Sequence, residues 1–169
     1  MKFVFIDTET TGLDPTQHEL WELALIVRED NGEQWEYERM VRPNLSNADP
    51  NALRINGFYD RFVSPSSIPT DIASFIAKFT SNATLVGANP SFDASFIDKF
   101  LRKWNYAPAW KHRMICVESL VAGALRLPEP VSLLKSAELM DIEVNTEEAH
   151  TASYDAHLAM QVYDAVMEN

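Results

Sequence analysis

The sequence has few of the residues that stabilise secreted proteins or anchor membrane proteins. Its single cysteine, Cys116, cannot form an internal disulfide, and its apolar neighbours indicate a buried side chain with no redox or nucleophilic role. No apolar run approaches the roughly 20 residues that a membrane span needs. The short apolar run before Asp7 also falls far below the apolar core of a secretion signal. We therefore expect a soluble, cytoplasmic protein with no membrane partner.

Positive charge is also scarce, because 14 lysines and arginines face 25 aspartates and glutamates, which gives a net charge of −11. Non-specific affinity for nucleic acid comes mainly from lysine and arginine, so this composition argues against a broad phosphate-binding surface. A nucleic acid held at a small, metal-bearing site stays possible, since the cations are then supplied at the site itself. The length of 169 residues and a hydrophobic content of 46% suit one domain over residues 1–169.

Two acids follow the first apolar run of the chain. Residues 3–6 are apolar, and residues 7–13 then read D-T-E-T-T-G-L. Alternate side chains of a strand point to the same face, at about 3.3 Å per residue, so Asp7 and Glu9 project side by side. Two neighbouring carboxylates repel each other unless a cation joins them. The pair therefore indicates a site for a hard metal with oxygen ligands, although the same pattern also occurs in turns and caps.

The first part of the chain is rich in strand patterns. Residues 20–41 alternate apolar and polar side chains around Asn31-Gly32, which predicts a hairpin. With residues 2–6, the hairpin gives three antiparallel strands. Residues 43–70 are rich in proline, asparagine and serine, and we expect them to cross the surface with only a short helix around Pro50 to Arg54.

Helices and strands alternate after residue 70. We expect a helix over 71–80 capped by Thr70 or Asp71, and a short buried strand over 84–87. The segment Asn89-Pro90-Ser91 predicts the start of a second helix, capped by Asn89 or Ser91.

The last third begins with a predicted fifth strand over 113–117. Pro128 and Pro130 separate two short helical segments, and a final helix carries an apolar stripe from Tyr154 to Val166. Three strands followed by alternating helices and strands indicate a mixed α/β sheet with helices on its faces.

Further acids lie where a metal centre could use them. Asp93 lies in the first turn of one predicted helix, and Asp155 lies near the start of the last. Each alone has an ordinary interpretation, because an acid in a first turn complements the helix dipole. The same is true of a lone histidine, which usually lies at the surface or packs in the core, and we interpret His18, His112 and His157 in that way.

Three separated motifs change this interpretation when they are taken together. They are D-x-E at residues 7–9, N-x-x-F-D at residues 89–93, and H-x4-D at residues 150–155. With them, the chain resembles the DnaQ-like 3′-to-5′ exonucleases of the DEDD superfamily, in the DEDDh subgroup whose last motif carries a histidine. The resemblance covers essentially the whole chain and includes the segments W-E-L-A at 21–24 and I-N-G-F at 55–58. It implies a ribonuclease-H-like, mixed five-stranded sheet flanked by helices.

The resemblance also implies roles for individual residues. Four carboxylates would hold two divalent metal ions, Mg²⁺ or Mn²⁺, with Asp7 bridging both: Asp7, Glu9, Asp93 and Asp155. His150 would be the general base, because an imidazole titrates near neutral pH and can accept a proton from the attacking water. Five residues along a helix rotate about 500°, so we expect His150 in the loop or first turn before the last helix.

The substrate contacts are implied in the same way. The backbone of Thr10 and Thr11 would meet the terminal 3′-hydroxyl, and Leu13 would act as an apolar wedge against the last bases. Asn89 and either Phe92 or Phe96 would lie near the terminal nucleotide.

The first choice of activity is a metal-dependent exonuclease that removes nucleoside 5′-monophosphates from the 3′ ends of single-stranded or mispaired DNA. An RNA-trimming 3′-to-5′ exoribonuclease is the alternative. A non-catalytic nucleic-acid-binding or scaffold domain of the same fold is a second alternative. The sequence leaves open whether a DNA polymerase is a partner and what the oligomeric state is.

Overall fold

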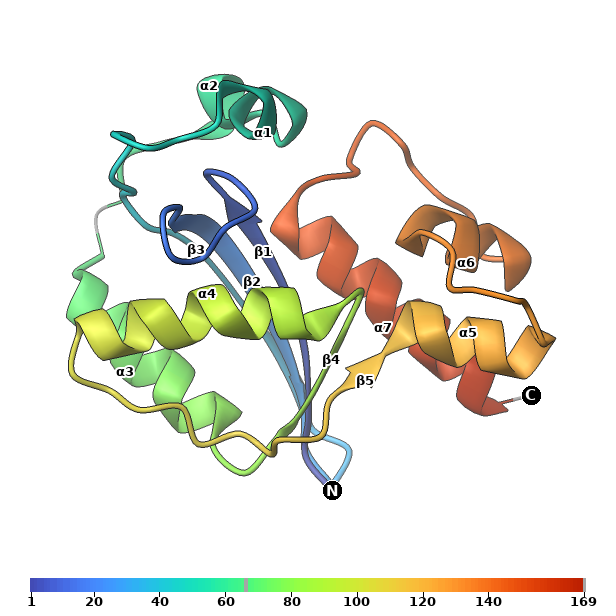
Figure 1. Cartoon of the computed structure of the whole chain (residues 1–169). Helices are drawn as coiled ribbons and strands as arrows, with labels where there is room; N and C mark the ends of the chain where they lie inside the picture. Colours follow the sequence, from blue (N-terminus) through green and yellow to red (C-terminus); the bar gives the residue numbers. More distant parts are fainter. Residues whose placement is uncertain (66, 169) are drawn as a thin grey trace.

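A five-stranded sheet forms the centre of the computed structural model, which describes residues 1–65 and 67–168. The strand order is β3-β2-β1-β4-β5 (Figure 1). The first three strands are antiparallel, whereas β4 and β5 run parallel to β1. The strands are β1 (Phe3–Thr10), β2 (Leu20–Arg28), β3 (Gln34–Met40), β4 (Thr84–Gly87) and β5 (Ile115–Cys116). The predicted mixed five-stranded sheet is therefore confirmed.

Helices cover both faces of this sheet (Figure 1). One face packs against α3 (Pro69–Thr80) and α4 (Pro90–Lys103). The other packs against α5 (Val117–Leu125), α6 (Leu133–Leu139) and α7 (Ala152–Glu168).

The side-chain alternation of β1 divides its residues between these two layers. Val4 and Ile6 lie in the core shared with α3 and α4, whereas Phe5 lies in the core shared with α7. Because the period of a strand is two, Asp7 and Glu9 share the face of Phe5 and point toward α7. Thr8 points toward α4 instead.

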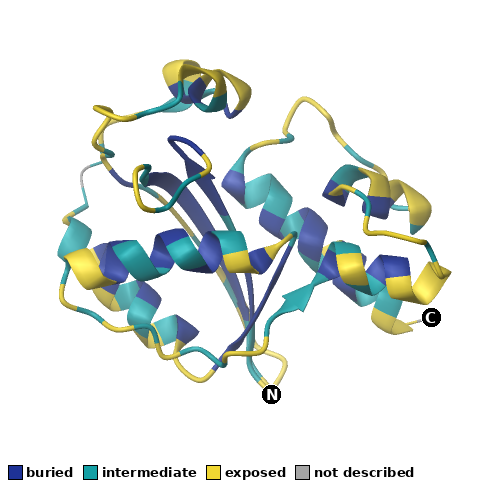
Figure 2. Cartoon of the chain, in the orientation of Figure 1, coloured by how far each residue is buried: buried dark blue, intermediate teal, exposed yellow. Residues whose placement is uncertain are grey.

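Two short helices cap the end of the sheet where β1 finishes (Figure 1). They are α1 (Pro50–Ile55) and α2 (Phe58–Arg61), joined by Gly57 in the left-handed conformation at φ 66°. Leu53 and Phe58 pack on Trp21 of β2, and most of the remaining helix surface is exposed (Figure 2). The predicted helix around Pro50 is confirmed. The four-residue α2 was not predicted, because it is too short to show a helical period.

The predicted cap of one helix is wrong, whereas the predicted cap of another, Asn89, is correct in position but forms no side-chain cap bond. Helix α3 begins at Pro69 after Ile68, not after Thr70 or Asp71. Proline is well suited to the first helical position, since its missing N–H would have no partner there. Helix α4 begins at Pro90 for the same reason, and Asn89 precedes it in a left-handed conformation with no side-chain cap. The Asn89 Oδ1 instead accepts a hydrogen bond of 2.9 Å from the Ser91 hydroxyl.

The fifth strand is shorter than predicted. It contains two residues rather than residues 113–117, because Val117 already begins α5. Cys116 lies at this junction on the sheet edge and is half-buried, so the prediction of a buried side chain is wrong.

The C-terminal third agrees with its predicted pattern. The two prolines separate α5 from α6, and α7 buries Leu158 and Val162 of the expected stripe. Among the helices that the structure describes, none is long and apolar enough to cross a membrane.

A pair of glycines offers a test of this packing. At Gly87 a Cβ atom would lie 2.8 Å from the Ile6 carbonyl oxygen, whereas at Gly123 it would meet nothing within 4 Å. We expect Gly87→Ala to lower the free energy of unfolding by about 1–3 kcal/mol, because β4 must move away from β1. Gly123→Ala should raise it by about 0.5–1 kcal/mol through helix propensity. Urea unfolding of both variants measures the difference, and equal effects would contradict the close approach of β4 to β1.

Candidate active site

Three carboxylates meet at the end of β1. Asp7 and Glu9 project from the strand toward α7, and Asp155 projects from the first turn of that helix. One potential ligand atom of each lies within 4.8 Å of the others. The i, i+2 spacing therefore brings the two strand acids together as predicted, and the α7 acid joins them.

Small side chains allow this approach of α7 to the sheet. Ala152, Ala156 and Ala159 are all buried in the core between the helix and the strands. Helix packing distances depend on the side chains at the contact, so alanines let the helix lie close to the sheet. The carboxylate of Asp155 can then reach the strand acids.

The fourth predicted acid comes from the opposite layer. Asp93 is 2% exposed in the first turn of α4, and its Oδ1 accepts a hydrogen bond of 2.7 Å from the Thr8 hydroxyl. It is not one of the three acids with mutually close ligand atoms, but its charge acts on Asp7 and raises the pKa of that residue. The four acids therefore converge on one strand end from both sides of the sheet.

Burial and mutual repulsion both raise the pKa values of these acids. Burial is the larger cause at Asp7, followed by Asp93, Glu9 and Asp155, and the pKa lies well above its usual range. Burial, together with Asp155 and Glu22, raises the pKa of Glu9 to about 9. The pKa of Asp93 rises to about 7 through burial, against the hydrogen bond from Thr8. Burial also raises the pKa of Asp155, although the charge of nearby His150 lowers it.

This donor set fits a divalent metal centre. All of the donors are carboxylate oxygens, which hard ions such as Mg²⁺ and Mn²⁺ prefer. A cation at the cluster would relieve the repulsion that raises the four pKa values. The side chains of Asp7, Glu9 and Asp155 would hold it, and Asp93 would support the same centre.

His150 lies in the loop that precedes α7, as predicted from its spacing to Asp155. The residue is exposed and adopts a left-handed backbone at φ 64°. Its backbone N–H donates a hydrogen bond to the carboxylate of Asp155. The histidine and the acids are therefore connected directly.

The predicted substrate residues of the first motif lie in a tightly bonded turn. The Thr10 hydroxyl donates to the Gly12 carbonyl oxygen at 2.8 Å. Thr11 is 0% exposed, its N–H donates to Glu19, and its carbonyl oxygen accepts from Asp49. These bonds fix the shape of the turn, and contact of its backbone with a 3′-hydroxyl stays a prediction. Leu13, at 78% exposure, is free to contact a ligand.

The predicted substrate residues of the second motif also differ in how far they are exposed. Phe96 is 1% exposed, which leaves no surface for a nucleotide, so the hypothesis that it contacts one is wrong. Phe92 is half-buried against Phe96 with a ring separation of 4.9 Å and keeps part of its surface open. Phe92 and the partly exposed Asn89 remain predicted contacts.

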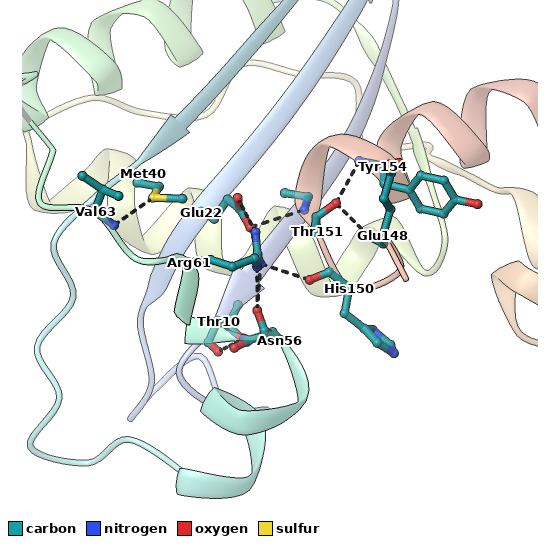
Figure 3. A network of polar contacts seen from close by, with 11 residues as sticks. Thr10, Glu22, Met40, Asn56, Arg61, Val63, Glu148, His150, Thr151 and Tyr154 are labelled. Atoms are coloured by element: carbon teal, nitrogen blue, oxygen red, sulfur yellow. Dashed lines mark hydrogen bonds and ion pairs between the residues drawn. The ribbon is translucent and has the colours of Figure 1, made fainter. Parts of the chain in front are cut away.

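A polar network lies beside the acids (Figure 3), and no role was predicted for it from the sequence. Its centre is Arg61, which bonds Glu22 and the backbone carbonyl oxygens of Asn56 and His150. Glu22 is the cross-strand neighbour of Glu9. The segments at 21–24 and 55–58 that carry Glu22 and Asn56 belonged to the recognised resemblance, whereas no pattern in the sequence indicated Arg61.

Comparison with known proteins identifies the family to which this arrangement belongs. A family model described as RNase_T, exonuclease, matches residues 4–163. The chain belongs to the RNase_T exonuclease family. The structure is also similar to that of E. coli exonuclease I in complex with a dT13 oligonucleotide, with a TM-score of 0.74 and 19% identity over 98% of this chain and 40% of that one. The predicted ribonuclease-H-like fold and the predicted resemblance are both confirmed.

Two curated relatives differ in how much of their length they share with this exonuclease-family chain. The PolC-type DNA polymerase III of Ureaplasma parvum is 23% identical over 174 residues, which cover 99% of this chain and 12% of that protein. Ribonuclease T of Actinobacillus pleuropneumoniae is 23% identical over 180 residues, which cover 97% of this chain and 82% of that protein. The chain thus spans about a tenth of the PolC-type relatives and most of the ribonuclease.

The raised pKa values predict how stability depends on pH and metal. The folded-state pKa values of Asp93, about 7, and Glu9, about 9, lie above those of the unfolded chain, near 4. The stability that these groups contribute is complete below the unfolded values and is lost as pH rises through the folded ones. In chelator we therefore expect the Tm to fall between pH 6 and pH 9. Mg²⁺ or Mn²⁺ should restore it, with the larger gain at higher pH.

Differential scanning calorimetry with and without metal checks this expectation. Glu9→Gln should flatten the pH dependence in chelator and reduce the gain from metal. Glu33→Gln, which removes an exposed charge far from the cluster, should change neither. A metal-induced gain that is the same in all three proteins would contradict a metal centre at these acids.

Proposed function

We propose that this chain is a divalent-metal-dependent 3′-to-5′ exonuclease in which residues 1–169 act as one domain. The observation that carries the proposal is the convergence of Asp7, Glu9 and Asp155, with Asp93 beside them and His150 in the adjoining loop. Membership of the exonuclease family supports the same reaction class. A fold that only binds nucleic acid has no need of four clustered acids, buried or half-buried, whose mutual repulsion destabilises it.

Each of these residues has a proposed role in phosphodiester hydrolysis. When bound, two divalent ions would neutralise charge on the phosphate and on the departing 3′-oxygen. Asp7, Glu9 and Asp155 would hold the ions, and Asp93 would complete the set from α4. His150 accepts the proton of the attacking water, and its exposed position in the loop gives it access to solvent.

For the substrate, we propose the 3′ end of a single strand or of a mispaired DNA duplex. The net charge of −11 disfavours a long basic binding track, so contacts with a few unpaired nucleotides must provide the affinity. The exposed Leu13 and the partly open Phe92 are suited to stack against bases. Similarity to PolC-type DNA polymerase III supports DNA, and a DNA polymerase is the proposed partner.

RNA trimming is the second candidate. The alignment with ribonuclease T covers 97% of this chain and 82% of the ribonuclease. Each of the two substrates is thus supported by a relative at similar identity. The rates of hydrolysis of matched DNA and RNA strands would decide between the two substrates.

The metal and base roles can be tested by substitution. We expect Asp155→Ala to lower kcat at least about 100-fold with little loss of fold, because the ion is no longer held from α7. His150→Gln should lower kcat about 100-fold or more while substrate affinity stays within two-fold. The control is Glu168→Gln, an exposed acid at the other end of α7. Full activity of Asp155→Ala would defeat the assignment of the site.

The substrate can be tested with 5′-labelled strands. Matched single-stranded DNA, RNA and mispaired duplex are incubated with Mg²⁺, Mn²⁺ or chelator, and the products are resolved by length. We expect a ladder that shortens from the 3′ end, faster on DNA than on RNA, and no products in chelator. A faster rate on RNA would select the second candidate, and no products under any condition would favour a binding or scaffold domain.

A further inference from the structure

Arg61 uses its whole guanidinium group to join three segments of the chain (Figure 3). Its Nη1 and Nη2 donate to the two carboxylate oxygens of Glu22 at 2.9 and 2.8 Å. Its Nη2 also donates to the backbone carbonyl oxygens of Asn56 at 2.7 Å and His150 at 3.1 Å. The guanidinium lies 5.0 Å from the ring centroid of Trp21. Strand β2, the α1–α2 cap and the His150 loop therefore meet at one side chain.

Glu22 explains why a cation is needed at this place. It is 1% exposed and lies directly across from Glu9 in the antiparallel register. Like charges at directly opposed strand positions destabilise a sheet. The bidentate pair with Arg61 places a positive charge directly against the Glu22 carboxylate, whose own charge raises the pKa values of Asp7, Glu9 and Asp155. Glu22 also accepts a hydrogen bond of 3.4 Å from the N–H of Ala152, the first residue of α7.

The backbone of His150 is held from both sides. Its left-handed φ of 64° is unfavourable for a residue other than glycine, so neighbouring groups must fix it. Asp155 accepts from its N–H, and Arg61 donates to its carbonyl oxygen. Both partners are members of, or adjacent to, the candidate active site. The imidazole points away from Arg61 (Figure 3), which leaves the ring free for chemistry.

We propose that Arg61 is a positioning residue for the reaction, which fixes the His150 backbone and thereby aims the imidazole at the attacking water. The inference rests on the proposed function, because it assigns an effect that is transmitted through His150. Arg61 does not touch the substrate or the metal ions in this role. Its contribution should therefore appear in kcat and vanish when the imidazole is absent.

A matched arginine elsewhere in the chain provides the control. Arg28 also forms a bidentate pair, with Asp164, and also lies 5.0 Å from an aromatic ring, that of Phe5. It pairs with Phe3 at the other end of β1, away from the acids. Arg28→Gln thus removes the same kind of contacts without touching the His150 loop. Any general cost of losing such a pair appears in both variants.

The central experiment is a double-mutant cycle in kcat on a 5′-labelled oligonucleotide. We expect Arg61→Gln to lower kcat about 10–100-fold with KM changed less than two-fold, while Arg28→Gln keeps the wild-type kcat. In the His150→Gln background, Arg61→Gln should lower kcat less than about three-fold, because the effects of residues that act as a unit are not additive. Arg61→Lys keeps the charge near Glu22 but not the fork of donors, so an intermediate kcat is expected.

A second readout does not depend on activity. In chelator, hydrogen exchange of the amides at residues 146–151 should be faster in Arg61→Gln than in the wild type, with exchange in β1 unchanged. Should Arg61→Gln unfold, the cycle and the exchange measurement are made with Arg61→Lys.

The outcomes separate the two proposals. If His150→Gln alone keeps full kcat, the proposed base role fails and the positioning role fails with it. If His150→Gln loses activity but Arg61→Gln lowers kcat in that background by the same factor as in the wild type, only the positioning role is overturned. It is also overturned if Arg61→Gln keeps the wild-type kcat, or if Arg28→Gln loses as much activity as Arg61→Gln.

Discussion

Repulsion between clustered carboxylates is the constraint on which the rest of this structure depends. Asp7, Glu9 and Asp155 lie within 4.8 Å of one another, and Asp93 raises the pKa of Asp7 from the other layer. Each acid would be more stable in water, so the fold must hold them where a cation can bind. A central strand buried on both faces, with helices on either side, supplies the rigidity that this arrangement requires.

The strand also distributes the acids between the two layers. Its alternation directs Asp7 and Glu9 to the α7 side and Thr8 to the α4 side, where Thr8 holds Asp93. The cluster therefore forms only when both helices are docked on the sheet. Under the proposed function, the same cluster would let an acidic protein act on an acidic polymer, because the ions and not the protein surface would bring the positive charge required at the phosphate.

The sequence was sufficient to predict those elements whose structure is determined by a local pattern. Strand β1, the hairpin and α7 follow from periodicity and turn residues, and the acids were recognised from three motifs in order. It failed where short elements depend on distant contacts. Helix α2 has four residues and is held by packing on Trp21, and strand β5 ends after two residues because α5 begins at once. Arg61 has no motif of its own, since its partners lie 5, 39 and 89 residues away.

The position of the proposed base, His150, on a loop explains why such distant contacts are needed. A histidine inside α7 could not share a face with an acid five residues away, so the base must precede the helix. A loop residue is held by no helical hydrogen bonds, and the left-handed φ of His150 adds strain that only its neighbours can support. Asp155 accepts from the N–H of this residue, and Arg61 donates to its carbonyl oxygen. Since Arg61 is itself fixed by Glu22, the strand that lies beside the candidate metal-binding acids also helps to determine the position of the proposed base.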